Sequence, residues 1–413
     1  MKIAFWPLER IIPYARNARK IPPAAVAKVA ASIQEFGWRQ PIVVDGKEVI
    51  ICGHARLLAA QKLGLREAPV HVADNLTPAQ VRAYRLLDNR SHEETTWDAD
   101  LLGLELLDLK GMGIDLDLTG FNTDEIDAYL KRGERGAGLS EEDDVPEVPE
   151  TPVSVPSDVW VMQRHRLLCG DATVAASYPQ LLAEERADMT FMDPPFGVDY
   201  EGKTKQKLKL LNDHLGSHFE GFLRAACTNV LAVTDGAVYI CMSSSELDTL
   251  QKAFTAAGGH WSTFLIWAKN TFTLGRSDYQ RQYEPILYGW AEGRRHYWCG
   301  ARDQGDVWFV NRRQVNDLHP TMKPVALVER AIANSSQGRA RVLDPFAGSS
   351  STLIACEKTG RQARLMELDP RYVDVAVRRW QDFTGAEAVL EADGRSFTTI
   401  AEERRGSVEP KAA

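Results

Sequence analysis

The sequence lacks the paired cysteines of a disulfide framework or a zinc site. Its six cysteines are scattered through 413 residues without any Cys-x-x-Cys spacing, so we expect neither bridges nor a bound metal. The six are Cys52, Cys169, Cys227, Cys241, Cys299 and Cys356. A signal peptide and an apolar run near 20 residues are also missing, which predicts a cytoplasmic chain without a membrane span.

An excess of basic residues, the usual mark of a nucleic-acid-binding protein, is missing too, because the formal net charge is −8. Residues 133–157 carry seven carboxylates and one arginine, so this segment alone accounts for −6. The nearly neutral remainder contains clusters that can contact phosphates. They are Lys203, Lys205, Lys207 and Lys209, and Arg294, Arg295, Arg302, Arg312 and Arg313. The lysine run is equally well explained as a solvated loop.

The motif Asp193-Pro194-Pro195-Phe196 follows an apolar run, 187–192, that predicts a buried strand. Open α/β sheets bind their ligands beyond the carboxyl ends of their strands. Two prolines fix φ and remove two backbone donors. A carboxylate and a carbonyl can then accept both hydrogens of a planar amine, while Phe196 stacks on the ring that carries it. Asp-Pro alone is also a common turn signal.

A strand, a tight turn of small residues and a helix are predicted over 341–358, with Asp344 and Gly348 in the turn. A second strand, 363–368, carries Glu367 near its end, where a carboxylate can accept hydrogen bonds from ribose hydroxyls. The turn lacks the Gly-Lys-Ser/Thr of phosphate-binding loops. We therefore expect S-adenosylmethionine, a ribose-bearing cofactor without phosphates, in place of ATP.

A third motif, His319-Pro320-Thr321-Met322-Lys323-Pro324, precedes an apolar helix predicted over 325–333. Proline suits a first helical turn. Thr321 and Lys323 lie beside the helix N-terminus, which favours anions such as a methionine carboxylate. The alternative is an ordinary helix start with a solvated lysine.

In this order, the three motifs resemble the β class of the amino-methylating DNA methyltransferases. The resemblance covers about residues 155–383. It includes several shorter elements: Leu168-Cys169-Gly170-Asp171, Leu211-Asn212-Asp213, Trp267–Asn270, Tyr283–Leu287 and Asp306-Val307-Trp308.

The resemblance implies an α/β fold with the Rossmann-like sheet of S-adenosylmethionine-dependent methyltransferases. It implies that Asp193, Pro194, Pro195 and Phe196 hold a base flipped out of double-stranded DNA. It further implies which residues line the cofactor pocket: Asp171, Thr321, Lys323, Asp344, Phe346, Gly348, Ser349 and Glu367. Homodimers are common in this class.

One departure concerns the turn after Asp344. The family usually shows Gly-Ser-Gly-Thr-Thr there, whereas Ser350 and Ser351 replace the second glycine and the first threonine. Serine tolerates tight backbone less well than glycine. We expect a shifted turn and weaker cofactor binding, but not inactivation.

Asp193 also bears on the target base. In the family, aspartate at this position goes mostly with the N6 amine of adenine and serine with the N4 amine of cytosine. The resemblance therefore implies a site-specific adenine methyltransferase. Cytosine N4 is the alternative, and an RNA substrate is a weaker third option.

The first third of the chain predicts a small separate domain with helices over 24–36 and 57–63 and strands over 41–44, 48–52 and 69–72. It resembles the ParB/sulfiredoxin-like domain over about residues 5–92. Gly53, Arg56 and Ala59 match the ParB phosphate-binding element, but Ala55 replaces its first arginine. Asn89 stands without the arginine expected at position 92. A docking or DNA-contacting module is therefore favoured over nucleotide binding.

The predicted organisation is a ParB-like domain with a helical extension at 1–132 and an acidic, proline-rich linker at 133–157. A methyltransferase domain at 158–400 and a tail at 401–413 follow. Residues 271–316 lack cofactor motifs and are expected to read the target sequence. This arrangement resembles phage and prophage proteins that often lack a paired nuclease. The alternative from another class is a ParB-like DNA-binding factor with a non-catalytic methyltransferase half.

Overall fold

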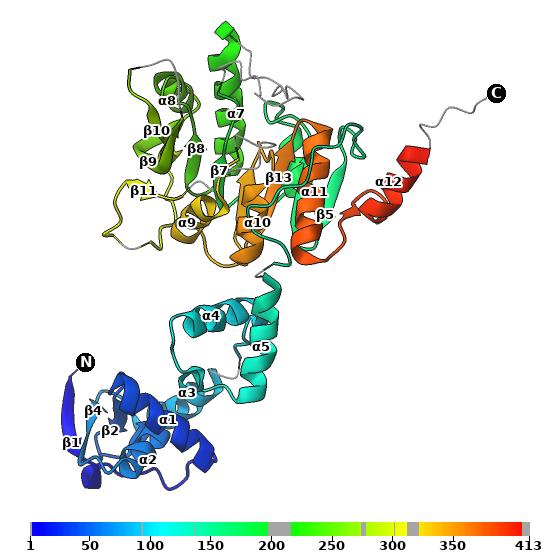
Figure 1. The fold of residues 1–413 in the computed structure, drawn as a ribbon. Helices are drawn as coiled ribbons and strands as arrows, with labels where there is room; N and C mark the ends of the chain where they lie inside the picture. Colours follow the sequence, from blue (N-terminus) through cyan, green and yellow to red (C-terminus); the bar gives the residue numbers. More distant parts are fainter. Residues whose placement is uncertain are drawn as a thin grey trace. The chain divides into compact units, whose positions relative to one another are not determined.

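The computed structural model describes residues 2–91, 94–136, 138–196, 216–273, 278–300, 302–311 and 322–406. The chain divides into two compact units, Met1–Gly133 and Glu134–Ala413 (Figure 1). Several predicted features lie outside the described residues: the lysine run 203–209, the element 211–213, Arg312, Arg313 and the motif residues 319–321. In the part that is described, no helix is long and apolar enough to cross a membrane.

The N-terminal unit is built on a four-stranded sheet of order β1-β4-β2-β3. Strand β2 is parallel to β4 and antiparallel to β3. Ile42, Ile50 and Leu57 lie in the core between this sheet and its helices. Its elements are β1 (Ile3–Pro7), η1 (Leu8–Arg10), α1 (Pro23–Phe36), β2 (Ile42–Asp45), β3 (Ile50–Cys52), α2 (His54–Lys62), β4 (Glu67–Ala73), α3 (Pro78–Ser91), α4 (Ala99–Gly111), η2 (Leu116–Thr119) and α5 (Thr123–Gly136).

Helix α2 begins after Gly53, whose φ of 105° is a left-handed conformation that glycine adopts at little cost. Arg56, in the first turn of this helix, is bound within the unit. It contacts Gln40 Oε1 and donates a 3.4 Å hydrogen bond to the Pro41 carbonyl. The matched arginine of the ParB element thus packs against the loop before β2.

Helices α4 and α5 cross at two glycines. A Cβ built on Gly103 would lie 2.5 Å from the Tyr129 carbonyl oxygen, and one on Gly133 would lie 2.4 Å from the Gly103 oxygen. Only glycine allows this approach. Leu106, Ile126 and Leu130 form the small core of the pair.

The second unit contains a ten-stranded sheet of order β11-β9-β10-β8-β7-β12-β13-β6-β5-β14, which confirms the predicted α/β class. Its elements are β5 (Val159–Met162), β6 (His165–Cys169), α6 (Ser177–Leu182), β7 (Met189–Met192), η3 (Gly216–His218), α7 (Phe219–Val233), β8 (Val238–Cys241), α8 (Leu247–Ala256), β9 (Gly259–Thr273), β10 (Arg281–Ala291), β11 (Val307–Phe309), α9 (Val325–Ser335), β12 (Arg341–Asp344), α10 (Ser351–Lys358), β13 (Gln362–Glu367), α11 (Pro370–Thr384), β14 (Val389–Leu390) and α12 (Phe397–Gly406).

Between the parallel neighbours β7 and β12, the side of the sheet on which the next strand is added changes. From β7 the chain passes through α7 to β8 on one side, and from β12 it passes through α10 to β13 on the other. Such a switch point opens a crevice at the carboxyl ends of the strands. Both aspartates lie at this position: Asp193 directly follows β7, and Asp344 is the last residue of β12.

The two faces of the sheet are covered by different helices, as the two cores on either side of β12 show. Val342 belongs to the core shared with α9, α10 and α11, whereas its neighbour Leu343 belongs to the core shared with α6, α7 and α8. Successive strand residues point to opposite faces. A buried parallel sheet therefore requires apolar residues at both positions.

The acidic segment that precedes β5 has no helix or strand over 138–157, and it is bound to the second unit. Asp374 of α11, fully buried, accepts hydrogen bonds from the backbone N–H groups of Val153 (2.5 Å) and Ser154 (2.9 Å) and from the Ser154 hydroxyl (2.6 Å). Asp143 Oδ1 accepts one from Val325 N at 3.0 Å, at the start of α9. The segment expected as an extended linker is thus attached to the helical layer.

Replacement of Asp374 by alanine tests this attachment. It leaves two buried N–H groups without their acceptor, so we expect the free energy of unfolding of the second unit to fall by about 3 kcal/mol. Urea denaturation followed by tryptophan fluorescence measures the change. Asp382→Ala on the exposed face of the same helix is the control, and equal stability of the two variants would contradict the attachment.

Candidate active site

Asp193 follows β7 directly, and its two carboxylate oxygens have different surroundings. Lys323 Nζ donates a 2.6 Å hydrogen bond to Oδ2. Oδ1 is buried, and none of the described residues donates a hydrogen bond to it. A buried acceptor without a partner is costly, so Oδ1 is available to a donor that enters the site.

Lys323 lies in the segment before α9 and makes a second ion pair with Glu284 of β10. Its Nζ is 2.9 Å from Glu284 Oε1, and Lys269 of β9 donates a 3.0 Å hydrogen bond to Glu284 Oε2. Asp193, Lys323, Glu284 and Lys269 thus form a row of alternating charge. Phe196 adjoins this row, with its ring centroid 5.2 Å from Lys323 Nζ.

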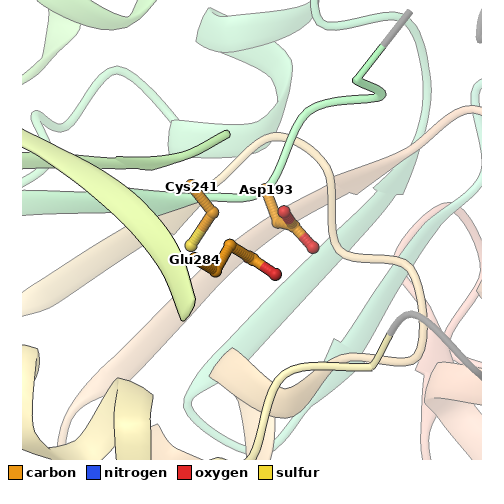
Figure 2. Close-up of side chains that lie close together, drawn as sticks. All are labelled: Asp193, Cys241 and Glu284. Carbon is orange, nitrogen blue, oxygen red and sulfur yellow. The ribbon is translucent and has the colours of Figure 1, made fainter. Parts of the chain in front are cut away.

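Cys241, the last residue of β8, completes the walls of the site (Figure 2). One ligand atom each from Asp193, Cys241 and Glu284 lies within 4.8 Å of the others, a grouping that resembles a metal site. The ammonium group of Lys323 already contacts both carboxylates. It supplies the positive charge that a metal ion would bring to these carboxylates.

The pKa values of the row follow from burial and from these pairs. Burial raises the pKa of Asp193 to about 6, although Lys323 opposes the rise. Burial also favours neutral Glu284, but Lys323 and Lys269 together hold its pKa below the usual range. Burial would lower the pKa of Lys323, yet Asp193 and Glu284 outweigh it and raise the pKa. Lys323 therefore stays protonated and cannot serve as a base near neutral pH.

The second part of the site is the turn between β12 and α10. Asp344 Oδ1 accepts a 3.0 Å hydrogen bond from Phe346 N, and Oδ2 accepts a 2.6 Å bond from the Thr352 hydroxyl. Glu367, at the end of β13, accepts a 2.8 Å bond from Gly348 N. The two carboxylates therefore fix the turn from both sides.

Both carboxyl groups are shifted toward their neutral forms. Burial raises the pKa of Asp344 to about 7, against the hydrogen bonds from Thr352 and Phe346. Burial also raises the pKa of Glu367. These two acids lie at the carboxyl ends of β12 and β13, where a bound cation or hydrogen-bond donors would stabilise their carboxylate forms.

The two serines that depart from the family pattern have different consequences. Ser350 has φ 64° and ψ 45°, so it adopts the left-handed conformation that a glycine would. Its hydroxyl is buried, and no described residue is hydrogen-bonded to it. Ser351 donates a 2.6 Å hydrogen bond to the Lys323 carbonyl. This bond ties the turn to the segment that carries Lys323.

The structure brings most of the predicted site residues to the carboxyl edge of the central strands. Asp171 follows β6, where its Oδ1 accepts hydrogen bonds from the backbone N–H and the hydroxyl of Thr173. Phe346 packs on the apolar core beneath the turn, and the Ser349 carbonyl accepts a 2.6 Å bond from Arg379. Thr321 lies outside the described residues.

Lys323 has two protein carboxylates as partners, Asp193 and Glu284, which the sequence pattern does not predict. Its contact with the carboxylate of the cofactor stays a prediction. Sequence reasoning missed Glu284, Lys269 and Cys241 as site residues. The available signal was the acid in Tyr283-Glu284-Pro285-Ile286-Leu287, a charged residue that enters an otherwise apolar strand.

Three family models match this chain. The model for DNA methylases matches residues 187–378, which include Asp193, Glu284, Lys323 and Asp344. The ParB N-terminal domain matches residues 2–90, and the ParB-methyltransferase HTH domain matches residues 100–156. The chain belongs to the DNA methyltransferases that carry an N-terminal ParB domain. The HTH match includes most of α4 and the whole of α5, which sequence reasoning described only as a helical extension of the ParB-like domain.

Individual relatives match parts of this methyltransferase, some the ParB domain and others the methylase domain. The ParB-like nuclease domain-containing protein YnaK of Escherichia coli is 42% identical over 80 residues, 19% of this chain and 92% of the relative. The DNA adenine methyltransferase YhdJ of Escherichia coli is 28% identical over 235 residues, 47% of this chain and 76% of the relative. The solved PvuII DNA methyltransferase, described as cytosine-N4-specific, is 15% identical, with a TM-score of 0.43; the match covers 63% of this chain and 94% of that one.

Replacement of Ser350 by glycine tests the strain in the turn. We expect the free energy of unfolding to rise by about 1 kcal/mol, because glycine removes a left-handed serine and its buried hydroxyl. Differential scanning calorimetry measures the change. Ser349→Gly is the matched control, since Ser349 lies outside the left-handed region and should lose stability. If Ser350→Gly is no more stable than the native chain, the turn is not strained.

Proposed function

We propose that this DNA methyltransferase transfers a methyl group to the N6 amine of adenine in double-stranded DNA. The observation that supports the proposal most directly is the buried Oδ1 of Asp193, which has no hydrogen-bond partner among the described residues. The Phe196 ring lies close by, with its centroid 5.2 Å from the Nζ of Lys323, the partner of Asp193. An exocyclic amine needs a hydrogen-bond acceptor, and its ring needs an aromatic surface. Cytosine offers the same amine chemistry, so the choice of adenine rests on the family's preference for aspartate at this position.

S-adenosylmethionine is the cofactor of the family, and the donor set at the turn fits it. Glu367 offers a carboxylate for ribose hydroxyls. Asp344 is a buried acid, and the charge of Asp193 contributes to the rise in the pKa of Asp344. Gly348 has φ 49°, and a Cβ built there would meet only the Phe346 oxygen at 4.0 Å, so the backbone is open to a close approach. When bound, the cofactor supplies a methyl group on a positively charged sulfur.

The residues of the chain would act on the amine by position and charge. Asp193 Oδ1 and the Pro194 carbonyl would accept the two amine hydrogens, which favours a tetrahedral and more nucleophilic nitrogen. Asp193 would take the proton that the amine loses, since its pKa near 6 allows brief protonation at neutral pH. Lys323, held as an ammonium, orients the carboxylate throughout.

The N-terminal unit would contribute to DNA binding. A helix–turn–helix match over residues 100–156 accompanies the ParB domain, and such motifs place a helix in the major groove. We therefore infer that this unit contacts DNA outside the methylated base. Whether the chain acts as a homodimer stays a prediction.

Asp193→Ala tests the assignment of the catalytic carboxylate. We expect methyl transfer from labelled S-adenosylmethionine to fall by about 100-fold or more, because the amine loses its acceptor, while DNA binding measured by fluorescence anisotropy is retained. Asp248→Ala, on the exposed face of α8, is the control. A wild-type protein that binds DNA and never transfers a methyl group would instead support the non-catalytic ParB-like factor.

The base is identified by mass spectrometry of nucleosides from treated DNA. The proposal predicts N6-methyladenine. If the products contain N4-methylcytosine and no N6-methyladenine, the assignment of adenine is wrong, but the assignment of the chain as an amino-methylating DNA methyltransferase still holds. The same digest of treated RNA checks the third option.

The dependence of the rate on pH follows from Asp193. Only its carboxylate form accepts the amine hydrogen, so with a pKa of about 6 the single-turnover rate should fall as the pH drops below about 6, by roughly tenfold per unit. Saturating cofactor keeps the titration of Asp344, near pH 7, from limiting the rate. A rate that is independent of pH between 5 and 8 would exclude Asp193 as the acceptor.

A further inference from the structure

Glu284 has no role in the site as the sequence describes it, yet it holds the centre of the charged row. It lies between two lysines: Lys323 Nζ at 2.9 Å from Oε1 and Lys269 Nζ at 3.0 Å from Oε2. The other partner of Lys323 is Asp193, at 2.6 Å. Two negative and two positive groups therefore balance in one chain of contacts.

The row is shielded from solvent. The side chain of Lys323 is 6% exposed, that of Glu284 11% and that of Lys269 14%, whereas Asp193 at the opening keeps 25%. The Trp267 ring covers Lys269, with its centroid 4.4 Å from Nζ. Charges at such depth interact strongly and rearrange when one partner is removed.

We propose that Glu284 is a positioning residue for methyl transfer, which holds the Lys323 ammonium against one oxygen of Asp193 and keeps the other oxygen free for the target amine. This inference rests on the proposed function of the site. Glu284 attracts the ammonium away from Asp193, so the lysine donates to Oδ2 alone, and Oδ1 has no donor among the residues that the structure describes. Without Glu284, the full charge of Lys323 would act on Asp193, and the ammonium could move to both oxygens.

The charges around Asp193 determine whether the loss of Glu284 raises or lowers the pKa of Asp193. Lys323 and Lys269 favour its carboxylate form, and Glu284 opposes it. Asp344 is a further acid within electrostatic reach. Cys241 is fully buried and its pKa is raised well above the usual value, so it stays a neutral thiol. Loss of the Glu284 charge should therefore lower the pKa of Asp193 and weaken it as an acceptor.

Glu284→Gln tests the proposal through the pH profile of single-turnover methyl transfer. We expect the plateau rate to fall by about tenfold or more and the acid limb to move to lower pH by about one unit. The KM for S-adenosylmethionine should change much less. Glu292→Gln is the matched control, because Glu292 follows the same strand, is 70% exposed and pairs only with His260 among the partners that the structure describes for it. An unmoved acid limb would overturn the proposal, even if the rate falls.

A second variant covers the case in which the single change prevents folding. Glu284→Gln with Lys269→Gln removes one charge of each sign and keeps the row neutral. Its acid limb should move in the same direction by a smaller amount, because Lys269 is the weaker of the two influences on Asp193. An acid limb at the native position in this variant would also overturn the proposal.

A measurement without turnover separates this inference from the proposed function. Carbon-13 NMR of labelled aspartate, assigned with Asp193→Asn, follows the titration of Asp193 in the native chain and in Glu284→Gln. A lower pKa in the variant supports the coupling, and an unchanged pKa overturns it. If the native chain transfers no methyl group while this shift is seen, the proposed function fails and the coupling holds.

Discussion

The buried contact between Lys323 and Asp193 is the interaction on which the rest of the site depends. The lysine comes from the segment before α9 and the aspartate from the end of β7, so one 2.6 Å bond joins two distant parts of the chain. The Lys323 carbonyl is in turn held by Ser351 of the cofactor turn. Loss of one member of a buried pair typically costs about 3–5 kcal/mol, because the other charge is left uncompensated. The base-binding and cofactor-binding parts therefore share a single structural anchor.

The switch point of the sheet explains why acids gather there. Asp193, Asp344 and Glu367 all lie at the carboxyl ends of parallel strands, where each strand gives way to the loop or turn that follows it. Burial moves the pKa values of Asp193 and Asp344 to about 6 and about 7. Both acids thus titrate close to neutral pH. One can exchange a proton with an amine, and the other can respond to a positively charged ligand.

The acidic segment before β5 helps to hold the elements that carry the site in place. Asp143 accepts from the first N–H group of α9, directly after Lys323 and Pro324. Arg379 donates to the carbonyls of both Glu142 and Ser349. The segment is therefore bound directly to the start of α9 and is linked to the cofactor turn through Arg379. Its net charge of −6, from seven carboxylates and one arginine, makes up most of the net charge of −8 of the chain.

The sequence predicted those parts of the site whose signals are local. Asp193 and Asp344 could be identified because each follows a short apolar strand within a compact motif, and α9 and α10 begin close to where the pattern placed them. Glu284 and Lys269 could not be identified in this way. Their contact with each other depends on the register of β9 against β10, and their contact with Lys323 depends on the order of the ten strands. Neither is a property of adjacent residues.

The protein partners of Lys323 could not be predicted for the same reason. A lysine beside a helix N-terminus suggests an anion, and the local pattern does not contain the carboxylates of β7 and β10 that meet it. Ser350, in contrast, is marked by a local signal. The family pattern has glycine at this position, and the serine adopts the left-handed conformation that glycine favours.

The most direct test of the account is the pH profile of methyl transfer by Lys323→Met under single-turnover conditions. If Lys323 holds and charges Asp193, the rate should fall by about 100-fold and the acid limb should move above pH 6, because Asp193 loses its main counter-charge. If the acid limb stays in place and only the KM for S-adenosylmethionine rises, Lys323 serves the cofactor alone, and the central role given to its contact with Asp193 is wrong.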